Sequence, residues 1–296
     1  MRTPIVLRAL VAIGLAAAGS HSFAQAPAAP AGATEITATF WNIQWFPGRR
    51  PNATRGEEQR QIGEVHREAA QFHCDVIGME EVRDWHAAEL AVQPLAGFKV
   101  DVCSTFPPRE GQTDTQQVAI ASKLQPLSAW AESWKVSGAI APPRGFAFAA
   151  YQLAPKQLVL VYAVHLKSNR GEIHEDIAIR EESIRQLVSH ITAMNNAYGK
   201  LGAITWIIGG DFNTSPDELR FRAEKTVPAV LANGFDWAWK NVPMASRITM
   251  PPDVRFPAAS FDQIFYRGAT LVRAWVSQTS PRASDHRAVN VTLALR

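Results

Sequence analysis

The 296-residue chain has few cysteines, little net charge and no long apolar run. Its two cysteines, Cys74 and Cys103, allow at most one disulfide, so a hydrophobic core must stabilise the fold. The apolar run 9–19 is shorter than the roughly 20 residues that a membrane-spanning helix needs. We therefore expect no integral membrane association. The chain also lacks internal repeats and Gly/Ser-rich linkers, which favours a single large domain.

The charge balance gives no strong electrostatic argument for a nucleic-acid or membrane partner. Lys and Arg number 30 and Asp and Glu number 27, a net charge of +3. Residues 1–26 hold two of the arginines and no acidic residue, which leaves 28 basic against 27 acidic residues in the remainder. A protein with almost no net charge exerts little long-range attraction, so any basic surface for a partner must be local.

The N-terminal segment has the order of features that is typical of a secretory signal peptide. Two arginines supply positive charge, an apolar run follows, and Ala24 and Ala26 are small residues at the positions that signal peptidase reads. We expect residues 1–26 to be a signal peptide and the protein to be exported, either to the periplasm or out of the cell. Residues 27–35 then form a flexible lead-in, and residues 36–296 form the domain.

Export would permit a disulfide, but the positions of the two cysteines leave the pairing open. Each cysteine lies where a strand end is expected, and buried free thiols are common at such positions. If the two strands run parallel, the cysteines lie at opposite ends and cannot form a bridge.

Short β-rich segments alternate with amphipathic helices along the chain. Helices are expected at 57–72 and 177–196, where apolar residues recur at the spacing of one helix face. The strands are bounded by Gly, Pro, Asp, Asn or Ser, as strands usually are. We expect an α/β structure with mixed sheets and outer helices. The expected strands are 36–43, 76–79, 98–103, 117–122, 147–153, 158–165, 204–208, 261–266, 271–278 and 288–295.

Several expected strands end on a polar side chain that can bind a metal or transfer a proton. Apolar strand bodies with reactive ends are a common way for a rigid scaffold to hold a functional site. A hydrogen-bonded buried amide explains Asn42 alone and a structural histidine explains His165 alone, so the pattern matters more than a single position. The residues at or just beyond the strand ends are Asn42, Glu81, His165, Asp211, Asp285 and His286.

The segment Gly-Gly-Asp-Phe-Asn at 209–213 is the strongest single indication of a site. It follows an apolar strand, its two glycines permit close backbone approach, and Asp211 and Asn213 project from one turn. An earlier apolar strand ends on two acids. A solvent-exposed strand end explains Glu80, whereas Glu81 is the residue type that hard cations such as Mg²⁺ bind.

A buried carboxylate and a histidine are expected to pair near the C-terminus. Asp262 lies within the apolar segment Ser-Phe-Asp-Gln-Ile-Phe, and a buried carboxylate requires a partner. His286, in Ser-Asp-His before the last strand, supplies that partner if it turns towards Asp262. Such a pair fixes the imidazole tautomer and raises its basicity.

Cationic residues near His165 suit an anionic substrate. Lys167 and Arg170 follow this histidine closely in the sequence. With Arg144 and Arg180, they are candidates for contacts to phosphate groups or to a nucleic-acid backbone.

Taken together and in this order, these segments resemble the endonuclease/exonuclease/phosphatase superfamily, which has the DNase I-like fold. The resemblance implies a four-layer α/β sandwich of two packed mixed β-sheets flanked by helices. It also implies hydrolysis of phosphate esters with a divalent cation, Mg²⁺ in the first place, with Mn²⁺ or Ca²⁺ as alternatives. The matching pieces are Trp-Asn at 41–42, Ile-Gly-Met-Glu-Glu at 77–81, His165, Gly-Asp-Phe-Asn at 210–213, Phe-Asp-Gln-Ile at 261–264 and Ser-Asp-His at 284–286.

The resemblance implies which residues form the metal site. Glu81 matches the principal metal ligand, Asn42 supports that site, and Asp285 is similar to a further acid at the metal. One departure is visible, because many members have Gln where this chain has Glu80, which adds a carboxylate near the ion.

The resemblance also implies catalytic roles. Asp211 and Asn213 match residues that orient the attacking water. His286, oriented by Asp262, resembles the histidine that contacts the phosphate or acts as general base. His165 resembles the second histidine, on the opposite side of the phosphate.

Among the branches of the superfamily, Trp-Asn-Ile-Gln-Trp-Phe and His-Leu-Lys-Ser-Asn-Arg-Gly look most like exported bacterial nucleases. We therefore expect a monomeric nuclease that acts on DNA or RNA. One alternative is a phosphodiesterase or phosphatase that acts on a phospholipid, similar to the sphingomyelinases, or on a small phosphoester. The other alternative is a binding protein that kept the fold and lost catalysis.

Overall fold

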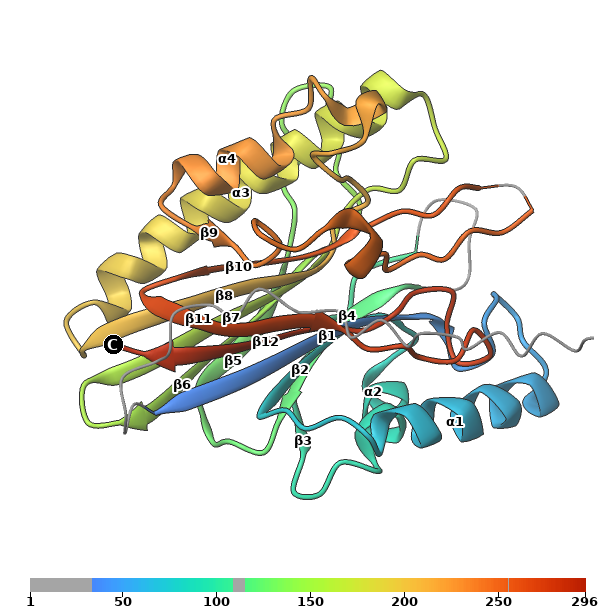
Figure 1. Cartoon of the computed structure of the whole chain (residues 1–296), viewed down its shortest axis with the longest axis horizontal. Coiled ribbons are helices and arrows are strands. Elements are labelled where there is room, and N and C mark those ends of the chain that lie inside the picture. Colours follow the sequence, from blue (N-terminus) through green and yellow to red (C-terminus); the bar gives the residue numbers. More distant parts are fainter. Residues whose placement is uncertain (1–33, 109–114, 255) are drawn as a thin grey trace, which may run out of the picture.

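Two six-stranded β-sheets pack face to face, and helices lie on their outer faces (Figure 1). The computed structural model describes residues 34–108, 115–254 and 256–296. The first sheet consists, from edge to edge, of β11 (Ala269–Val276), β12 (Val289–Leu295), β1 (Glu35–Phe46), β2 (Val76–Val82), β4 (Gln117–Ser122) and β3 (Lys99–Cys103). The second consists of β5 (Pro126–Ser133), β6 (Gly145–Ala154), β7 (Gln157–His165), β8 (Ala203–Asp211), β10 (Asp262–Arg267) and β9 (Asp236–Trp237). The expected four-layer α/β sandwich is confirmed.

Each sheet contains one pair of parallel neighbours joined by a helical crossover, as parallel strands require. Helix α1 (Arg55–Ala69) connects β1 to β2, and helix α3 (Ile173–Tyr198) connects β7 to β8. The shorter helices α2 (Trp85–Val92) and α4 (Thr226–Ala232) lie beside them (Figure 1). Because parallel strands end at the same edge, the C-terminal ends of β1 and β2 lie together, as do those of β7 and β8.

Strand alternation divides the apolar residues among three layers. In β2, Val76 belongs to the central core between the sheets, whereas Ile77 and Met79 face α1 and α2. In β8, Ile207 faces the central core and Ile208 faces the layer that contains α3 and α4. Successive strand residues point to opposite faces, so every other position along each strand reaches the space between the sheets.

The helix and strand boundaries differ from the expected ones by a few residues. Helix α1 begins earlier because Thr54 and Glu57 form a capping box, in which each side chain bonds the other residue's backbone N–H. Strand β1 begins at Glu35, which we expected in the lead-in. Four of the α-helices and strands lie outside the expected segments, namely α2, β5, β9 and α4. Strand β5 is an edge strand with mostly half-buried residues, and the other three are short.

The two cysteines are free. Strands β2 and β3 both run antiparallel to β4, which separates them, so they are parallel to each other. Cys74 precedes β2 and Cys103 ends β3, which places the two thiols at opposite ends of the sheet.

The expected signal peptide, and nearly all of the lead-in, lie outside the described residues. In residues 34–108, 115–254 and 256–296, no helix combines the length and the apolar character that crossing a membrane requires.

Candidate active site

The reactive residues gather at the edge where strands of both sheets end. In the first sheet, Asn42 of β1 lies opposite Glu80 of β2. In the second sheet, Asp211 of β8 lies between His165 of β7 and Asp262 of β10. The register therefore brings together side chains that are far apart in the sequence.

Glycines allow the two sheets to approach closely behind this edge. A Cβ atom on Gly78 or Gly209 would lie 2.5 Å or 2.3 Å from the ring of Phe40, which occupies the space between them. Gly210 has a φ of +128°, and a Cβ atom there would lie 2.2 Å from the carbonyl oxygen of Val164. All three positions require glycine for space, and Gly210 requires it for backbone conformation as well.

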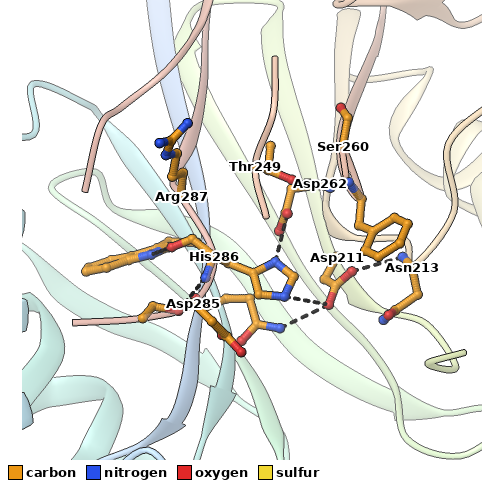
Figure 2. Close-up of polar contacts among 12 residues, drawn as sticks. Asp211, Asn213, Thr249, Ser260, Asp262, Asp285, His286 and Arg287 are labelled. Atoms are coloured by element: carbon orange, nitrogen blue, oxygen red, sulfur yellow. Dashed lines mark hydrogen bonds and ion pairs between the residues drawn. The ribbon is translucent and has the colours of Figure 1, made fainter. Parts of the chain in front are cut away.

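Asp211 lies at the centre of the cluster (Figure 2). Its Oδ2 accepts a hydrogen bond from Asn42 Nδ2 at 3.0 Å. The same oxygen lies 3.5 Å from His165 Nε2 and 3.9 Å from His286 Nε2. Its Oδ1 accepts from the backbone N–H of Asn213 at 2.9 Å. One carboxylate thus connects an amide, two imidazoles and the loop after β8.

Glu81 is held beside Asp211 by a strained backbone. Its Oε1 lies 3.3 Å from Asn42 Nδ2 and 3.6 Å from His165 Nε2, and its Oε2 accepts from the N–H of Trp45 at 3.0 Å. The pairing of β2 with β4 shifts register here, and Glu81 has a φ of +61°. Bulges of this kind redirect a side chain, and positive φ in a non-glycine residue is typical of functional sites.

His286 and Asp262 form a buried pair, in which Nδ1 and Oδ2 lie 2.8 Å apart (Figure 2). The loop that carries His286 is fixed to β1. The His286 carbonyl accepts from Trp41 Nε1 at 3.0 Å, and Ser284 Oγ donates to the Asn42 carbonyl at 2.7 Å. The structure thus brings the two residues together as the sequence indicated.

Burial and neighbouring charges shift the protonation of this cluster. Burial raises the pKa of Asp211 to about 7, although the positive charge of His286 opposes this shift. Burial alone lowers the pKa of His286, but the carboxylates of Asp262 and Asp211 outweigh it and leave that pKa well above its usual value. Burial, followed by the charge of Asp285, raises the pKa of Glu81. The acidic side chains of the site therefore outnumber the positively charged side chains that could balance them.

Glu80 is completely buried, so the expectation of a solvent-exposed strand end is wrong. It points into the space between the sheets because it lies on the same strand face as Val76 and Gly78. Within the described part of the chain, neither of its carboxylate oxygens has a hydrogen-bond partner, and Oδ1 of Asp262 also lacks one. Burial, together with the charges of Asp262 and Asp211, raises the pKa of Glu80 well above its usual value.

This donor set fits a hard divalent cation. Mg²⁺ prefers carboxylate oxygens, and the site offers several together with buried carboxylate oxygens that lack partners. Glu81 and Asp285 are the expected ligands, and the negative charge of Asp285 already acts on Glu81. A second group, Asp211, Asp262 and His286, offers ligand atoms within 4.8 Å of one another. Because His286 and Asp262 are hydrogen-bonded to each other, Glu81 and Asp285 are the better candidates.

The amide oxygen of Asn42 does not point at the carboxylates, so Asn42 is not arranged as an oxygen ligand of a metal beside them. Its Oδ1 accepts from the N–H of Gln44 at 3.0 Å, so its amide nitrogen faces the carboxylates of Glu81 and Asp211. In this arrangement, Asn42 orients the two acids. Gln44, which the sequence did not single out, also accepts from the N–H of Asp285 at 3.2 Å and thereby positions that acid.

Two of the expected cations lie at the site and are engaged there. Arg144 donates to the carbonyls of His165 and Leu166 at 3.0 Å and 2.7 Å, at the end of β7. Lys167 forms an ion pair with Asp176 and donates to a neighbouring carbonyl. Arg170 is exposed in the loop between β7 and α3.

Arg180 is fully buried, so the expectation that it contacts a nucleic-acid backbone is wrong. Its guanidinium forms two hydrogen bonds with Glu224, at 2.8 Å and 2.7 Å. It also donates to the Lys167 carbonyl at 3.0 Å, and Glu224 accepts from Thr214 Oγ1 at 3.0 Å. The buried pair therefore fixes the two loops that follow β7 and β8, one of which carries Asn213.

Replacing Arg180 by methionine is expected to lower the free energy of unfolding by about 3–5 kcal/mol, because Glu224 would remain buried without its partner. The double variant Arg180→Met/Glu224→Leu should regain most of that loss. Urea unfolding of both variants measures the effect. Arg185→Met, which removes an exposed guanidinium that pairs with Glu182 on the same helix, should change the unfolding midpoint much less. Equal losses in the single and double Arg180 variants would contradict a paired-charge role.

Two packed mixed sheets with a site of acids and histidines at their common edge define the DNase I-like class of α/β proteins. The chain belongs to the endonuclease/exonuclease/phosphatase family, whose model matches residues 39–286. Members of this family are phosphoric ester hydrolases and generally use divalent metals. No curated protein matches the chain in a sequence comparison.

Solved structures with the same fold have low sequence identity to the chain. An endonuclease/exonuclease/phosphatase from Beutenbergia cavernae DSM 12333 is 18% identical, with a TM-score of 0.65 over 88% of this chain and 72% of that one. An endonuclease/exonuclease/phosphatase family protein from Leptotrichia buccalis C-1013-b is 15% identical, with a TM-score of 0.63 over 88% and 100% of the two chains. D. rerio TDP2 complexed with single strand DNA product is 15% identical, with a TM-score of 0.62 over 88% and 99%.

Proposed function

We propose that the protein is an exported, divalent-metal-dependent phosphodiesterase that hydrolyses nucleic acid as a monomer. The observation that carries the proposal is the convergence of both sheets at one edge, where His165 Nε2 lies 3.6 Å from Glu81 and 3.5 Å from Asp211. Family membership supports phosphoester hydrolysis. D. rerio TDP2, which has a similar fold, was solved with a single-strand DNA product, and this supports a nucleic-acid substrate.

His286 is placed to take a proton from an attacking water. Because its Nδ1 lies 2.8 Å from the Asp262 carboxylate, that nitrogen carries a proton, and Nε2 is the nitrogen that exchanges a proton with the water or with Asp211. Asp211 lies 3.9 Å from this nitrogen and has a pKa near 7, so the two groups share a proton in the neutral pH range. The backbone N–H of Asn213 donates to Asp211, which holds Asn213 beside Asp211 and His286, where it can orient the water.

His165 is placed to stabilise negative charge on the phosphate. Its Nε2 lies 3.6 Å from the Glu81 carboxylate and 3.5 Å from that of Asp211, so an N–H at this position points to where the phosphate would lie. A positioned donor of this kind acts where charge develops in the transition state. A divalent cation on Glu81 and Asp285 would neutralise the phosphate oxygens and polarise the phosphorus centre.

The function is tested by incubating the purified protein with supercoiled plasmid DNA and Mg²⁺. We expect nicking that EDTA abolishes, because the acidic site needs a cation to accept an anionic substrate. An RNA substrate in parallel decides between the two nucleic acids. Wild-type protein that is folded and binds Mg²⁺, yet cleaves neither DNA nor RNA, would overturn the nuclease proposal.

The proposed export is tested separately by the mature N-terminus. When the full chain is expressed in a bacterium with a general secretory pathway, we expect the purified protein to begin at Pro27, since the small residues at 24 and 26 define the cleavage site. Mass spectrometry of the intact protein measures this. An Ala26→Arg variant should remain unprocessed. Wild-type protein that retains residues 1–26 in the cytoplasm would contradict export.

A further inference from the structure

Helix α1 carries a glutamine on the face that packs against the first sheet. Gln61, Val65 and Ala69 recur every four residues and are all buried, so they form one stripe along the helix. A buried amide needs partners for its two N–H groups and its oxygen. Gln61 finds all of its partners in the backbone of two chain segments that border the candidate active site.

The first segment is the end of β1 and the turn that follows it. Gln61 Nε2 donates to the carbonyls of Ile43 and Gln44, at 2.7 Å and 3.1 Å. Its Oε1 accepts from the backbone N–H groups of Gly48 and Arg49. Gln44 and Arg49 have φ values of +46° and +66°. Residues other than glycine keep this conformation only where the surroundings fix it, and the Gln61 amide fixes both ends of the turn.

The second segment is the loop before β12, which carries Asp285 and His286. Gln61 Nε2 also donates to the carbonyl of Ala283 at 2.8 Å. Ala283 is fully buried and lies two residues before Asp285. One side chain therefore connects the turn after β1 with a loop that follows 222 residues later in the sequence.

The two connected segments hold the two expected metal ligands. In the turn after β1, the N–H of Trp45 donates to Glu81 Oε2 at 3.0 Å. Gln44 Oε1 accepts from the N–H of Asp285 at 3.2 Å. The negative charge of Asp285 acts on Glu81, so the two acids repel each other. A cation binds best where such acids are already held at the right separation, and a neutral amide holds them without adding charge.

We propose that Gln61 is a positioning residue for the metal site. Because it bonds both segments, it fixes Glu81 relative to Asp285 and thereby raises their affinity for a divalent cation. The inference rests on the metal site of the proposed function, and it adds to that site a residue of α1 that does not contact the ion.

The test is Gln61→Met, which keeps the length of the side chain and removes its hydrogen bonds to both segments. We expect the dissociation constant for Mg²⁺ to rise about 10-fold, the lower end of the range for residues that orient metal ligands. Isothermal titration of the full protein with Mg²⁺, without substrate, measures it. A purely structural role would lower thermal stability and leave this constant unchanged. An unchanged constant in the folded variant would overturn the inference.

Ile191→Ala is the control for stability that is lost elsewhere. Ile191 is buried in the layer beside α3, so its truncation should lower the Tm and leave the Mg²⁺ affinity at the wild-type value. A similar loss of Mg²⁺ affinity in Ile191→Ala would show that general destabilisation weakens binding, and it would overturn the role of Gln61.

Gln44→Ala decides the question if Gln61→Met does not fold. The Gln44 side chain is only half-buried, so its loss should not prevent folding. The variant removes the bond to the N–H of Asp285, and we expect it to weaken Mg²⁺ binding about 10-fold as well. An unchanged dissociation constant would show that the turn after β1 does not position Asp285, and the inference would be wrong.

Mg²⁺ titration and the plasmid assay separate this inference from the proposed function. Weaker Mg²⁺ binding in Gln61→Met, with no cleavage of nucleic acid by the wild type, would remove the nuclease proposal and retain the role of Gln61. Cleavage by the wild type with equal Mg²⁺ affinity in both proteins would retain the nuclease and remove that role. A wild type that binds no Mg²⁺ at millimolar concentration would overturn both.

Discussion

His286→Ala is expected to lower kcat on a phosphodiester substrate about 100- to 10,000-fold, with little change in thermal stability. Asp262 holds the imidazole at hydrogen-bond distance beside Asp211, and general acid–base groups contribute rate factors of this size. Asp211→Asn should cause a loss of similar size, because an amide cannot share the proton with His286. Steady-state kinetics on plasmid or oligonucleotide substrates measures both losses.

Asp262 and His286 should act as one unit. We expect the double variant Asp262→Asn/His286→Ala to be no slower than His286→Ala alone, since Asp262 contributes only through the ring that it orients. His86→Ala, which removes an exposed histidine from α2, is the control and should keep the wild-type rate. A further large loss in the double variant would show that Asp262 acts on the substrate independently. A His286→Ala rate within a few-fold of wild type would contradict the assignment.

The main features of the site follow from patterns that are visible in the sequence. Polar residues end apolar strands, and Asn42 and His165 lie on the face that alternation directs between the sheets. Asp211 lies two residues beyond Gly209, and Asp262 lies two residues before Ile264, both on the inner face. The same alternation places Glu80 on the inner face with Gly78, so its burial was predictable from the strand pattern. Assigning it to a solvent-exposed strand end gave too much weight to its charge.

Other features depend on tertiary contacts that a local pattern does not contain. The positive φ of Glu81 arises where β2 shifts register against β4, and neither residue type nor spacing indicates such a bulge. Arg180 occupies a helix position where a charged residue normally faces solvent, and its partner Glu224 lies 44 residues away. Edge strand β5 has a weak apolar alternation because one of its faces is only half-buried, so its pattern resembles that of a loop.

Glu80→Gln is expected to raise the free energy of unfolding of the metal-free protein at pH 8, by about 1–3 kcal/mol. The wild-type carboxyl is buried without a hydrogen-bond partner among the described residues, and the carboxylates of Asp262 and Asp211 act on it. At pH 8, the folded protein must either ionise this group among like charges or hold its proton against the solvent. A glutamine of the same shape has no charge, and its amide supplies donors for carboxylates such as that of Asp262.

The sign of the pH dependence follows from the folded pKa values. Burial raises the pKa of Glu80 and raises that of Asp211 to about 7, and unfolded acids titrate near pH 4. The stability that these groups contribute is therefore fully present below the unfolded pKa and is lost as the pH rises through the folded pKa. His286 has the same sign, because its folded pKa also lies above its unfolded one. The metal-free wild type should thus become progressively less stable between pH 5 and pH 8.

Urea unfolding in EDTA at pH 5, 6, 7 and 8 measures this dependence. Glu80→Gln should differ least from the wild type at pH 5, where the wild-type carboxyl holds its proton in the folded state, and exceed it increasingly towards pH 8. Glu89→Gln, at an exposed position of α2, should follow the wild-type curve throughout. Mg²⁺ should stabilise the wild type more at pH 8 than at pH 5, because a cation binds the deprotonated acids. If Glu80→Gln destabilised the protein at pH 8, the buried carboxylate would have a favourable partner in solution, and the charge surplus assigned to this site would be wrong.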